Sequence, residues 1–425
     1  MFGFFASQEK KMRENAANWL ELADKVYHYR RDVLPAAQVS ELQSRNAELQ
    51  ALLKERAGAE KLKLAIERLE EVLRRTGGAI YPKTALVENV EFFLVAAIVI
   101  LGIRTYFVQP FKIPTNSMWP TYNGMTPEAW KNPAEAPGPL MRVVRFALFG
   151  AQRKQLIAPE AGTVSLVMTH GGQIHYEVKD ARSWLIFPTK NKEYTFLVND
   201  KPVRVQVPGD FQFEWAFREC TGLTDVDLLR LAQASTRTWP GGRIVPLPLK
   251  AEPGKAFLAF DIVTGDQLFV DRVSYHFVPP KVGQGFVFRT DHIESPHMVD
   301  RETGRQLEQY YIKRLVGTPG DKLEIREPAL IRNGQPIAGS VAFAANAGRS
   351  GKYGGYFNAP PYLGGAGYLK SGETLTVPPG KFFAMGDNSG NSQDGRYWGY
   401  VPAKDVVGRP MFVYYPFTRH WGPAR

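Results

Sequence analysis

The chain has 425 residues, which is long for one domain and favours two or more folding units. Its single cysteine, Cys220, excludes an intramolecular disulfide and a cysteine-based metal site. The net charge of +11 is compatible with nucleic acid or anionic lipid as a partner, but the basic residues are dispersed and no recognition helix or zinc-finger spacing accompanies them. We therefore expect no nucleic-acid partner.

Residues 1–84 are expected to form a soluble helical extension. Ser40 followed by Gln43 fits a capping box and predicts that a helix starts there, after the break at Pro35. Further along, apolar residues recur at spacings of four, three and four, which predicts an apolar stripe on one helical face. These residues are Leu62, Ile66, Leu69 and Leu73. The pattern favours helices that pack on each other over a dedicated partner surface.

The most apolar stretch runs from Phe92 to Ile103 and is short for a membrane span. Apolar residues on both sides extend it to residues 85–108, enough to cross ~30 Å of hydrocarbon with some tilt. Arg104 then has to reach one interface with its long side chain. The alternative is a buried helix of a soluble protein. Because the segment lies far from the first residue, we expect a transmembrane signal-anchor and not a cleavable signal peptide.

After Pro110 the pattern changes to short strands and turns, consistent with the 39 Gly and 31 Pro of the chain. Residues Lys192 to Val207 alternate around Asn199-Asp200, which predicts a hairpin. Residues Asp225 to Ala234 are predicted to form a short amphipathic helix. We find no catalytic spacing in residues 124–255 and interpret them as a mostly β insertion that is dispensable for any chemistry the rest of the chain carries out.

Three clusters contain residues that can carry chemistry. In the first, Pro114 and Pro120 restrict the backbone on either side of Ser117, although a serine between prolines is by itself typical of an ordinary loop. In the second, residues 310–321, strand alternation puts Lys313 on the same face as Tyr311 and Leu315. Burial on such a face lowers a lysine pKa from ~10.4 by up to ~3–5 units, enough for a neutral base near pH 7. A lysine that reaches solvent from a sheet edge is the alternative.

The third cluster, residues 385–399, is dense in short polar residues. It lacks the ligand spacing of an EF-hand, and Asp394 and Arg396 are better suited to an ion pair that braces the loop. A Ser-His-Asp or metal site remains open as a rival hypothesis, although no nucleophile-elbow or HExxH spacing supports it. Its candidate residues are His276, His292, His297, Asp291 and Asp300.

Taken together, the motifs resemble those of the type I signal (leader) peptidases. Four segments match the family's patterns in the same order as in the family: Phe111 to Tyr122, Gly265 to Val270, Tyr311 to Asp321 and Gly386 to Gly399. The resemblance covers about residues 85–122 and 256–416. It does not cover the insertion or the N-terminal helices.

The resemblance implies a Ser/Lys dyad with Ser117 as the nucleophile and Lys313 as the general base. It further implies that the Ser392 hydroxyl orients the lysine amine and that the Thr115 hydroxyl helps to form the oxyanion hole. Thr115 replaces the family's usual serine and keeps the hydroxyl. Implied substrate-binding residues are Phe111, Ile113, Tyr122, Tyr311 and Ile312. Residues implied to give structural support are Asp387, Asp394 and Arg396. No cofactor or metal is expected.

The implied fold is mostly β, with a catalytic domain of coiled antiparallel sheets, one N-terminal transmembrane helix and a helical extension. The expected domains are 1–84, 85–108, 109–123 with 256–425, and the 124–255 insertion. The implied function is a membrane-bound serine endopeptidase that cleaves signal peptides from exported preproteins. The alternative is a non-catalytic membrane-anchored binding or scaffold protein on the same fold.

The implied location is the bacterial inner membrane, with a single pass. Expected partners are preproteins and membrane lipids, with the secretion translocon as a candidate further partner. Basic residues are more numerous before the span than after it, so the positive-inside rule predicts a cytoplasmic N-terminus and an extracytoplasmic catalytic domain. Those counted are Arg68, Arg74, Arg75 and Lys83 before the span, against Arg104 and Lys112 after it.

Overall fold

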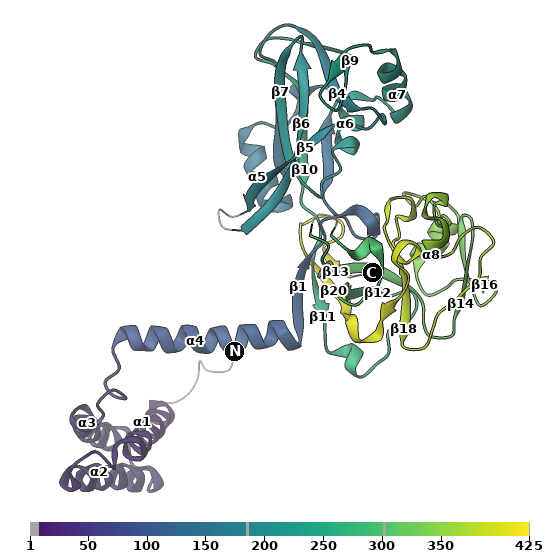
Figure 1. Ribbon diagram of the computed structural model, residues 1–425. Coiled ribbons are helices and arrows are strands. Elements are labelled where there is room, and N and C mark those ends of the chain that lie inside the picture. Colours follow the sequence, from purple (N-terminus) through teal and green to yellow (C-terminus); the bar gives the residue numbers. More distant parts are fainter. Residues whose placement is uncertain (1–7, 184–186, 301–302, 425) are drawn as a thin grey trace. The chain divides into compact units, whose positions relative to one another are not determined.

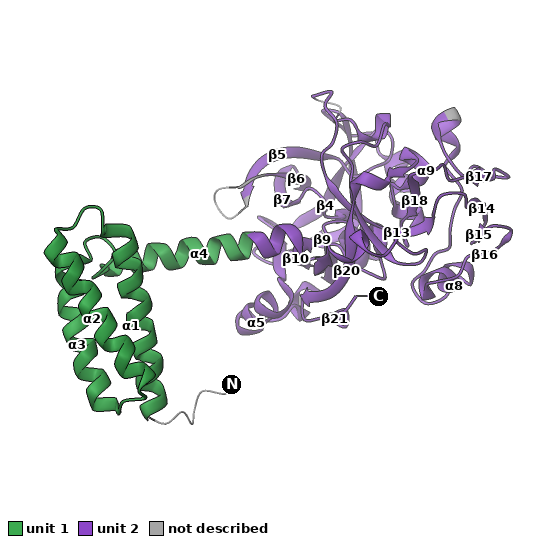
Figure 2. Cartoon of the chain, turned by 90° about the horizontal axis from the view of Figure 1, so that it is seen from below, with its two compact units in different colours: residues 1–101 green, residues 102–425 purple. Residues whose placement is uncertain are grey.

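The computed structural model describes residues 8–183, 187–300 and 303–424. The chain divides into two compact units, residues 1–101 and residues 102–425 (Figure 2). The first unit is helical and the second is mostly β (Figure 1). The expected fold class, a mostly β protein with a helical N-terminal region, is therefore confirmed.

Three helices of the first unit pack around one apolar core. They are α1 (Gln8–Arg30), α2 (Ala36–Lys54) and α3 (Ala59–Thr76). The predicted stripe of leucine and isoleucine on α3 is buried in this core, as expected from its spacing. The prediction that a helix starts at Ser40 is wrong. The helix begins at Ala36 with Pro35 at its N-cap, because the intervening Ala and Gln residues are good helix formers and extend it back to the proline.

Helix α4 (Ala85–Tyr106) is long and apolar enough to cross a membrane, as judged by its length and composition, and none of its apolar window is buried. It ends two residues earlier than the expected span, because Val108 already belongs to strand β1. Each apolar residue from Phe92 to Val95 is more than half exposed. An apolar helix without protein cover is what a lipid environment requires, whereas a core helix of a soluble protein would be buried.

One large antiparallel sheet of the second unit carries the matched motifs. Its strand order is β1-β11-β20-β12-β13-β18-β19, with β21 paired to β20. The strands are β1 (Val108–Lys112), β11 (Gln267–Asp271), β20 (Val406–Tyr415), β12 (Gly285–Arg289), β13 (Tyr310–Gly317), β18 (Lys381–Met385), β19 (Val401–Pro402) and β21 (Gly422–Pro423). Register shifts interrupt the pairing of β20 with both of its neighbours, and such irregularities let a sheet coil.

Beside this sheet lies a small sheet in the order β16-β15-β14-β17. Its strands are β14 (Lys322–Arg326), β15 (Ala329–Arg332), β16 (Gln335–Pro336) and β17 (Leu375–Thr376). The short helix α8 (Val341–Ala347) contacts β15 of this sheet, whereas α9 (Gly395–Trp398) contacts β18 of the large sheet.

The insertion forms two further antiparallel sheets. One has the order β5-β6-β4-β9-β8, with β7 paired to β6, and the other has the order β2-β10-β3. The strands are β2 (Thr126–Trp130), β3 (Gln152–Ile157), β4 (Gly162–Thr169), β5 (Tyr176–Ser183), β6 (Phe187–Val198), β7 (Lys201–Pro208), β8 (Thr238–Trp239), β9 (Gly242–Ala251) and β10 (Ala256–Val263). The helices are α5 (Pro139–Phe149), α6 (Phe213–Thr221) and α7 (Asp225–Ala234).

Two local predictions for the insertion are confirmed. Strands β6 and β7 form a hairpin with Val198 opposite Lys201, and the turn residue Asn199 has the positive φ of 53° that such turns require. Helix α7 spans the predicted residues and begins with a capping box at Thr224. Strand β10, which follows the insertion in the chain, pairs with β2 and β3 and not with the large sheet, so the insertion lobe extends to Val263.

Aromatic packing provides the core of this lobe. Phe213 is fully buried, stacks on Tyr194 with ring centroids 4.2 Å apart, and meets Phe260 edge-on at 5.9 Å. Removing its ring leaves a cavity, so we expect Phe213→Ala to lower the unfolding free energy of the lobe by roughly 3–5 kcal/mol, measured by urea denaturation. Phe277→Ala is the control, because Phe277 is 81% exposed, and it should change stability by less than about 0.5 kcal/mol. Equal effects of the two substitutions would contradict this packing.

Candidate active site

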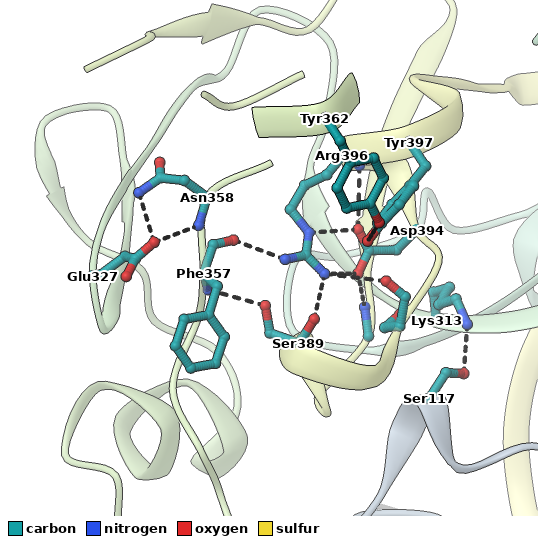
Figure 3. A network of polar contacts seen from close by, with 12 residues as sticks. Ser117, Lys313, Glu327, Phe357, Asn358, Tyr362, Ser389, Asp394, Arg396 and Tyr397 are labelled. Atoms are coloured by element: carbon teal, nitrogen blue, oxygen red, sulfur yellow. Dashed lines mark hydrogen bonds and ion pairs between the residues drawn. The ribbon is translucent and has the colours of Figure 1, made fainter. Parts of the chain in front are cut away.

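Ser117 and Lys313 meet although 196 residues separate them in the chain. Ser117 lies in the single turn η1 (Asn116–Met118), which follows β1, and Lys313 lies in the middle of β13. Both side chains are buried, and the lysine Nζ donates to the serine Oγ at 2.5 Å (Figure 3). This distance and this seclusion from solvent allow direct proton transfer between the two groups.

The turn that holds Ser117 is fixed from two sides through Asn116. The buried Asn116 side chain accepts from the Gly124 N–H at 2.9 Å and donates to the Met125 carbonyl at 2.9 Å. On the other side, Asn388 donates from its side chain to the Asn116 carbonyl and from its backbone N–H to the Ser117 carbonyl, both at 3.0 Å. The serine hydroxyl is therefore presented by a backbone with little freedom to move.

Burial lowers the pKa of Lys313 to about 8, and the negative charge of Asp394 limits that lowering. The ammonium form is penalised because no carboxylate of the described chain forms an ion pair with it. The Nζ also lies 5.5 Å from the centre of the Tyr311 ring on the same strand face, as the alternation predicted. With a pKa of about 8, roughly a tenth of the lysine is neutral at pH 7, far more than for a lysine with a pKa of ~10.4.

Arg314, the next residue of β13, differs from Lys313 in that it forms an ion pair with a carboxylate. It is almost fully buried, and it donates from Nε and NH2 to the two oxygens of Asp387 at 2.7 and 2.5 Å. Asp387 also accepts from the Thr121 hydroxyl at 2.5 Å, just beyond the nucleophile turn. This bidentate pair therefore ties the base strand, the segment after Ser117 and the 386–392 loop to one another.

The expected ion pair between Asp394 and Arg396 is present, with Arg396 Nε donating to Asp394 at 2.8 Å (Figure 3). Arg396 also donates to the Phe357 carbonyl at 2.8 Å and to the Ser389 carbonyl at 2.7 Å. Asp394 in turn accepts from the Gly386 N–H at 3.0 Å. The pair thus fixes the shape of the loop that covers the dyad.

Ser392 lies in this loop, where its Oγ is buried and accepts or donates no hydrogen bond within the described chain. A Cβ at Gly386 would lie 2.2 Å from this oxygen and 2.5 Å from the Ser117 carbonyl oxygen. Glycine at 386 is thus what allows the loop to approach the nucleophile so closely.

A cavity of about 780 Å³ opens beside the dyad. All four residues with predicted catalytic roles line it, namely Thr115, Ser117, Lys313 and Ser392. Four of the five predicted substrate-binding residues line it as well, namely Phe111, Ile113, Tyr311 and Ile312. The predicted supporting residues, Asp387, Asp394 and Arg396, lie behind this lining and are fully buried.

The fifth predicted substrate-binding residue, Tyr122, does not line the cavity, and this prediction is corrected. The structure places its side chain in the apolar core beneath the cavity, 2% exposed, in a cluster with Ile113 and Met118, and not in the lining. The reason is that the chain turns after Met118, whose carbonyl accepts from the Tyr122 N–H at 3.0 Å, so the ring points inward.

The sequence did not indicate Arg314, Asn116, or the two insertion residues Asp210 and Gln212 that line the cavity. The rival histidine site has no support in the described part of the chain. His292 pairs with Asp405 at 2.7 Å, no histidine lines the described cavity, and no cluster of three or more metal-ligating side chains is found among the described residues.

Comparison with known proteins concerns the part of the chain that carries Lys313. Residues 259–415, which contain Lys313 and the 386–399 loop, match the family model for signal peptidase, peptidase S26. This part of the chain is therefore similar to the signal peptidase S26 family.

Two curated relatives each match a stretch of more than 150 residues of the chain. A probable signal peptidase I-1 of Synechocystis sp. is 33% identical over 158 residues, covering 37% of this chain and 66% of the relative. A signal peptidase I of Leptolyngbya laminosa is 30% identical over 154 residues, covering 36% of this chain and 62% of the relative. The chain therefore spans slightly less than two thirds of the length of these relatives. A crystal structure of a signal peptidase I from Enterococcus faecalis matches with 28% identity and a TM-score of 0.21, covering 31% of this chain and 97% of that one.

The buried Arg314–Asp387 pair gives a stability prediction. Asp387→Ala leaves the arginine buried without its carboxylate, so we expect a loss of roughly 3–5 kcal/mol in the free energy of unfolding, measured by urea denaturation. The matched control is Asp200→Ala, because the Asp200 side chain is 86% exposed. Replacing both partners, in Asp387→Leu with Arg314→Met, should recover most of the loss. A double variant no more stable than Asp387→Ala would show that the buried charge is not the cause.

Proposed function

We propose that this chain is a membrane-anchored serine endopeptidase that cleaves signal peptides from exported preproteins with a Ser117/Lys313 dyad. The observation that carries the proposal is the buried Lys313 amine, 2.5 Å from the Ser117 hydroxyl at the wall of an open cavity. The S26 match and the signal peptidase relatives support the same reaction class.

In the proposed mechanism, neutral Lys313 accepts the proton of Ser117 as Oγ attacks the peptide carbonyl. The negative charge that forms on the carbonyl oxygen is stabilised by the Ser117 N–H and the Thr115 hydroxyl, and Thr115 lines the same cavity. The lysine then returns the proton to the leaving amine, and a water molecule, deprotonated by Lys313, releases the acyl group. Ser392 supplies a buried hydroxyl that lines the same cavity and makes no hydrogen bond within the described chain, so it is available to orient the amine.

An extended peptide fits strand edges beside the cavity that have no partner strand among the described residues. Strand β1 is paired on one side, with β11, and residues 310–313 of β13 are paired on one side, with β12, because β18 joins β13 only from Arg314 onward. A substrate can add its backbone to these edges, so that recognition depends on the backbone and on the small side chains before the cut.

Two apolar surfaces support a location at a membrane. Helix α4 has the length and composition of a span and is uncovered by protein. In the second unit, α5 exposes Leu140, Val143 and Phe146, which is typical of a helix that lies at a lipid interface. Since β1 begins two residues after α4 ends, the nucleophile turn follows the membrane segment closely in the chain. We propose a cytoplasmic N-terminus and an extracytoplasmic S26 domain.

The dyad predicts three inactive variants. Ser117→Ala and Lys313→Ala should each lower kcat by at least about 1,000-fold on a model preprotein, since one removes the nucleophile and the other the base. Lys313→Arg should also fail, because a guanidinium does not give up its proton. Ser371→Ala and Lys404→Ala, at exposed positions, are the controls and should remain active. Full activity of Lys313→Arg would exclude the lysine as the base.

The lowered pKa of Lys313 predicts the pH dependence of cleavage. The active form is the neutral amine, so kcat/KM should fall about tenfold per pH unit below the lysine pKa of about 8 and level off above it. Initial rates on a peptide substrate between pH 5.5 and 10 measure this profile. An acid limb near ~6.5 would instead indicate a histidine, and a flat profile would contradict a lysine base.

The proposed topology is tested by adding protease to sealed spheroplasts of cells that express the chain. The segment after Pro110 should be digested, and the helical residues before Ala85 should be protected by the membrane. Lysed spheroplasts are the control, in which both parts should become accessible. Digestion of the N-terminal helices alone in sealed spheroplasts would reverse the topology.

A further inference from the structure

The insertion contributes one wall of the substrate cavity. Asp210 and Gln212, from the segment between β7 and α6, line the cavity together with Ser117 and Lys313. The Gln212 side-chain oxygen also accepts from the Asn116 side chain at 3.4 Å, one residue before the nucleophile. The insertion is therefore in contact with the active-site turn.

Buried aromatic residues hold this wall in place. Phe211 and Phe213 alternate with the two cavity residues and are fully buried in the core of the insertion lobe. Phe211 stacks on Phe260 with nearly parallel rings 5.9 Å apart. Trp215 of α6 also meets Trp119, just after the nucleophile turn, edge-on at 5.8 Å. Because Phe211 and Phe213 are anchored in the core, the neighbouring Asp210 and Gln212 are held at the cavity.

The wall brings a negative charge to the cavity. Asp210 is the one carboxylate among the described residues that line it, where the cations are Lys112 of β1 and Lys313 of β13. The charge of Asp210 affects the pKa of one residue on each of the two facing strands, Lys112 on β1 and Tyr311 on β13. Burial lowers the pKa of Lys112 and the charge of Asp210 opposes this shift, while burial raises the pKa of Tyr311 and Asp210 adds to it. A peptide in the cavity thus meets a carboxylate on the insertion side.

We propose that Asp210 is a specificity-determining residue that favours substrates with a basic rather than an acidic side chain at one position near the cut. The physical reason is attraction between opposite charges at a partly desolvated rim, and repulsion between like charges. Phe211 and Phe213 position the carboxylate, and Gln212 joins the wall to the nucleophile turn. The inference rests on the proposed function, since it requires a peptide to occupy the cavity.

The test uses the full-length protein in detergent and a peptide series in which one position at a time, across the six residues around the cut, carries Lys, Gln or Glu. At one position we expect kcat/KM for the Lys peptide to exceed that for the Glu peptide by about 5-fold, the range of a partly exposed ion pair. In Asp210→Asn this ratio should fall at least about threefold, and in Asp210→Lys it should invert. Because the carboxylate is exposed at the rim, 1 M salt should also reduce it. Asp200→Asn, at an exposed aspartate on the β6–β7 turn, is the matched control and should keep the wild-type ratio.

The same peptides are also titrated against Ser117→Ala proteins with and without Asp210→Asn, with fluorescence anisotropy as the readout of binding. This measurement does not depend on cleavage. Charge-dependent binding without turnover by the Ser117-containing protein would overturn the proposed function and support the role of Asp210. Turnover with a Lys/Glu ratio that Asp210→Asn leaves unchanged at every position would overturn the role of Asp210 alone. The absence of any charge preference in both assays would also overturn it.

Discussion

Lys313 and Arg314 are consecutive residues of one strand, and both basic side chains are buried. The active site depends on a difference between them, because, among the described residues, only Arg314 has a carboxylate as its ion-pair partner. The strand alternates, so they point to opposite faces. Arg314 receives both oxygens of Asp387. The carboxylate that most affects Lys313, Asp394, is already engaged by Arg396. The lysine is therefore left without an ion-pair partner in the described chain, and its amine loses its proton far more easily than a lysine in water.

The polar residues around the dyad have two roles, to engage the nearby carboxylates and to shape the loop over Ser117. The arginines keep the two carboxylates away from the lysine, and the same hydrogen bonds shape the loop over the nucleophile. Asp387 meets Thr121, and Asn388 meets the carbonyls of Asn116 and Ser117. A single set of contacts therefore serves the charge balance and the geometry of the dyad together. Substituting one member is expected to disturb both.

Much of the site could be predicted from the sequence, because short motifs encode local backbone and side-chain chemistry. The strand around Lys313, the Asp394–Arg396 pair and the β6–β7 hairpin all follow from patterns within about 20 residues. Contacts between distant segments could not be predicted in this way. The partner of Arg314 is 73 residues away, and Gln212 is 96 residues from Asn116. The insertion carries no motif, so nothing in its residues indicated that it would reach the cavity. We expected the insertion to be dispensable for cleavage, yet two of its residues, Asp210 and Gln212, line the cavity.

Strand β20 is formed by residues near the end of the chain, yet it lies in the middle of the large sheet, between β11 and β12. During synthesis, β1 with the nucleophile turn can pair with β11 well before β20 leaves the ribosome, and β12 can pair with β13. The two halves that carry serine and lysine have no shared strand until β20 enters between them. Closing such non-local contacts is a late and slow step of folding. In a growing chain of this protein, the strand that carries the serine turn and the strand that carries the lysine therefore have no common neighbour until residues 406–415 have been synthesised.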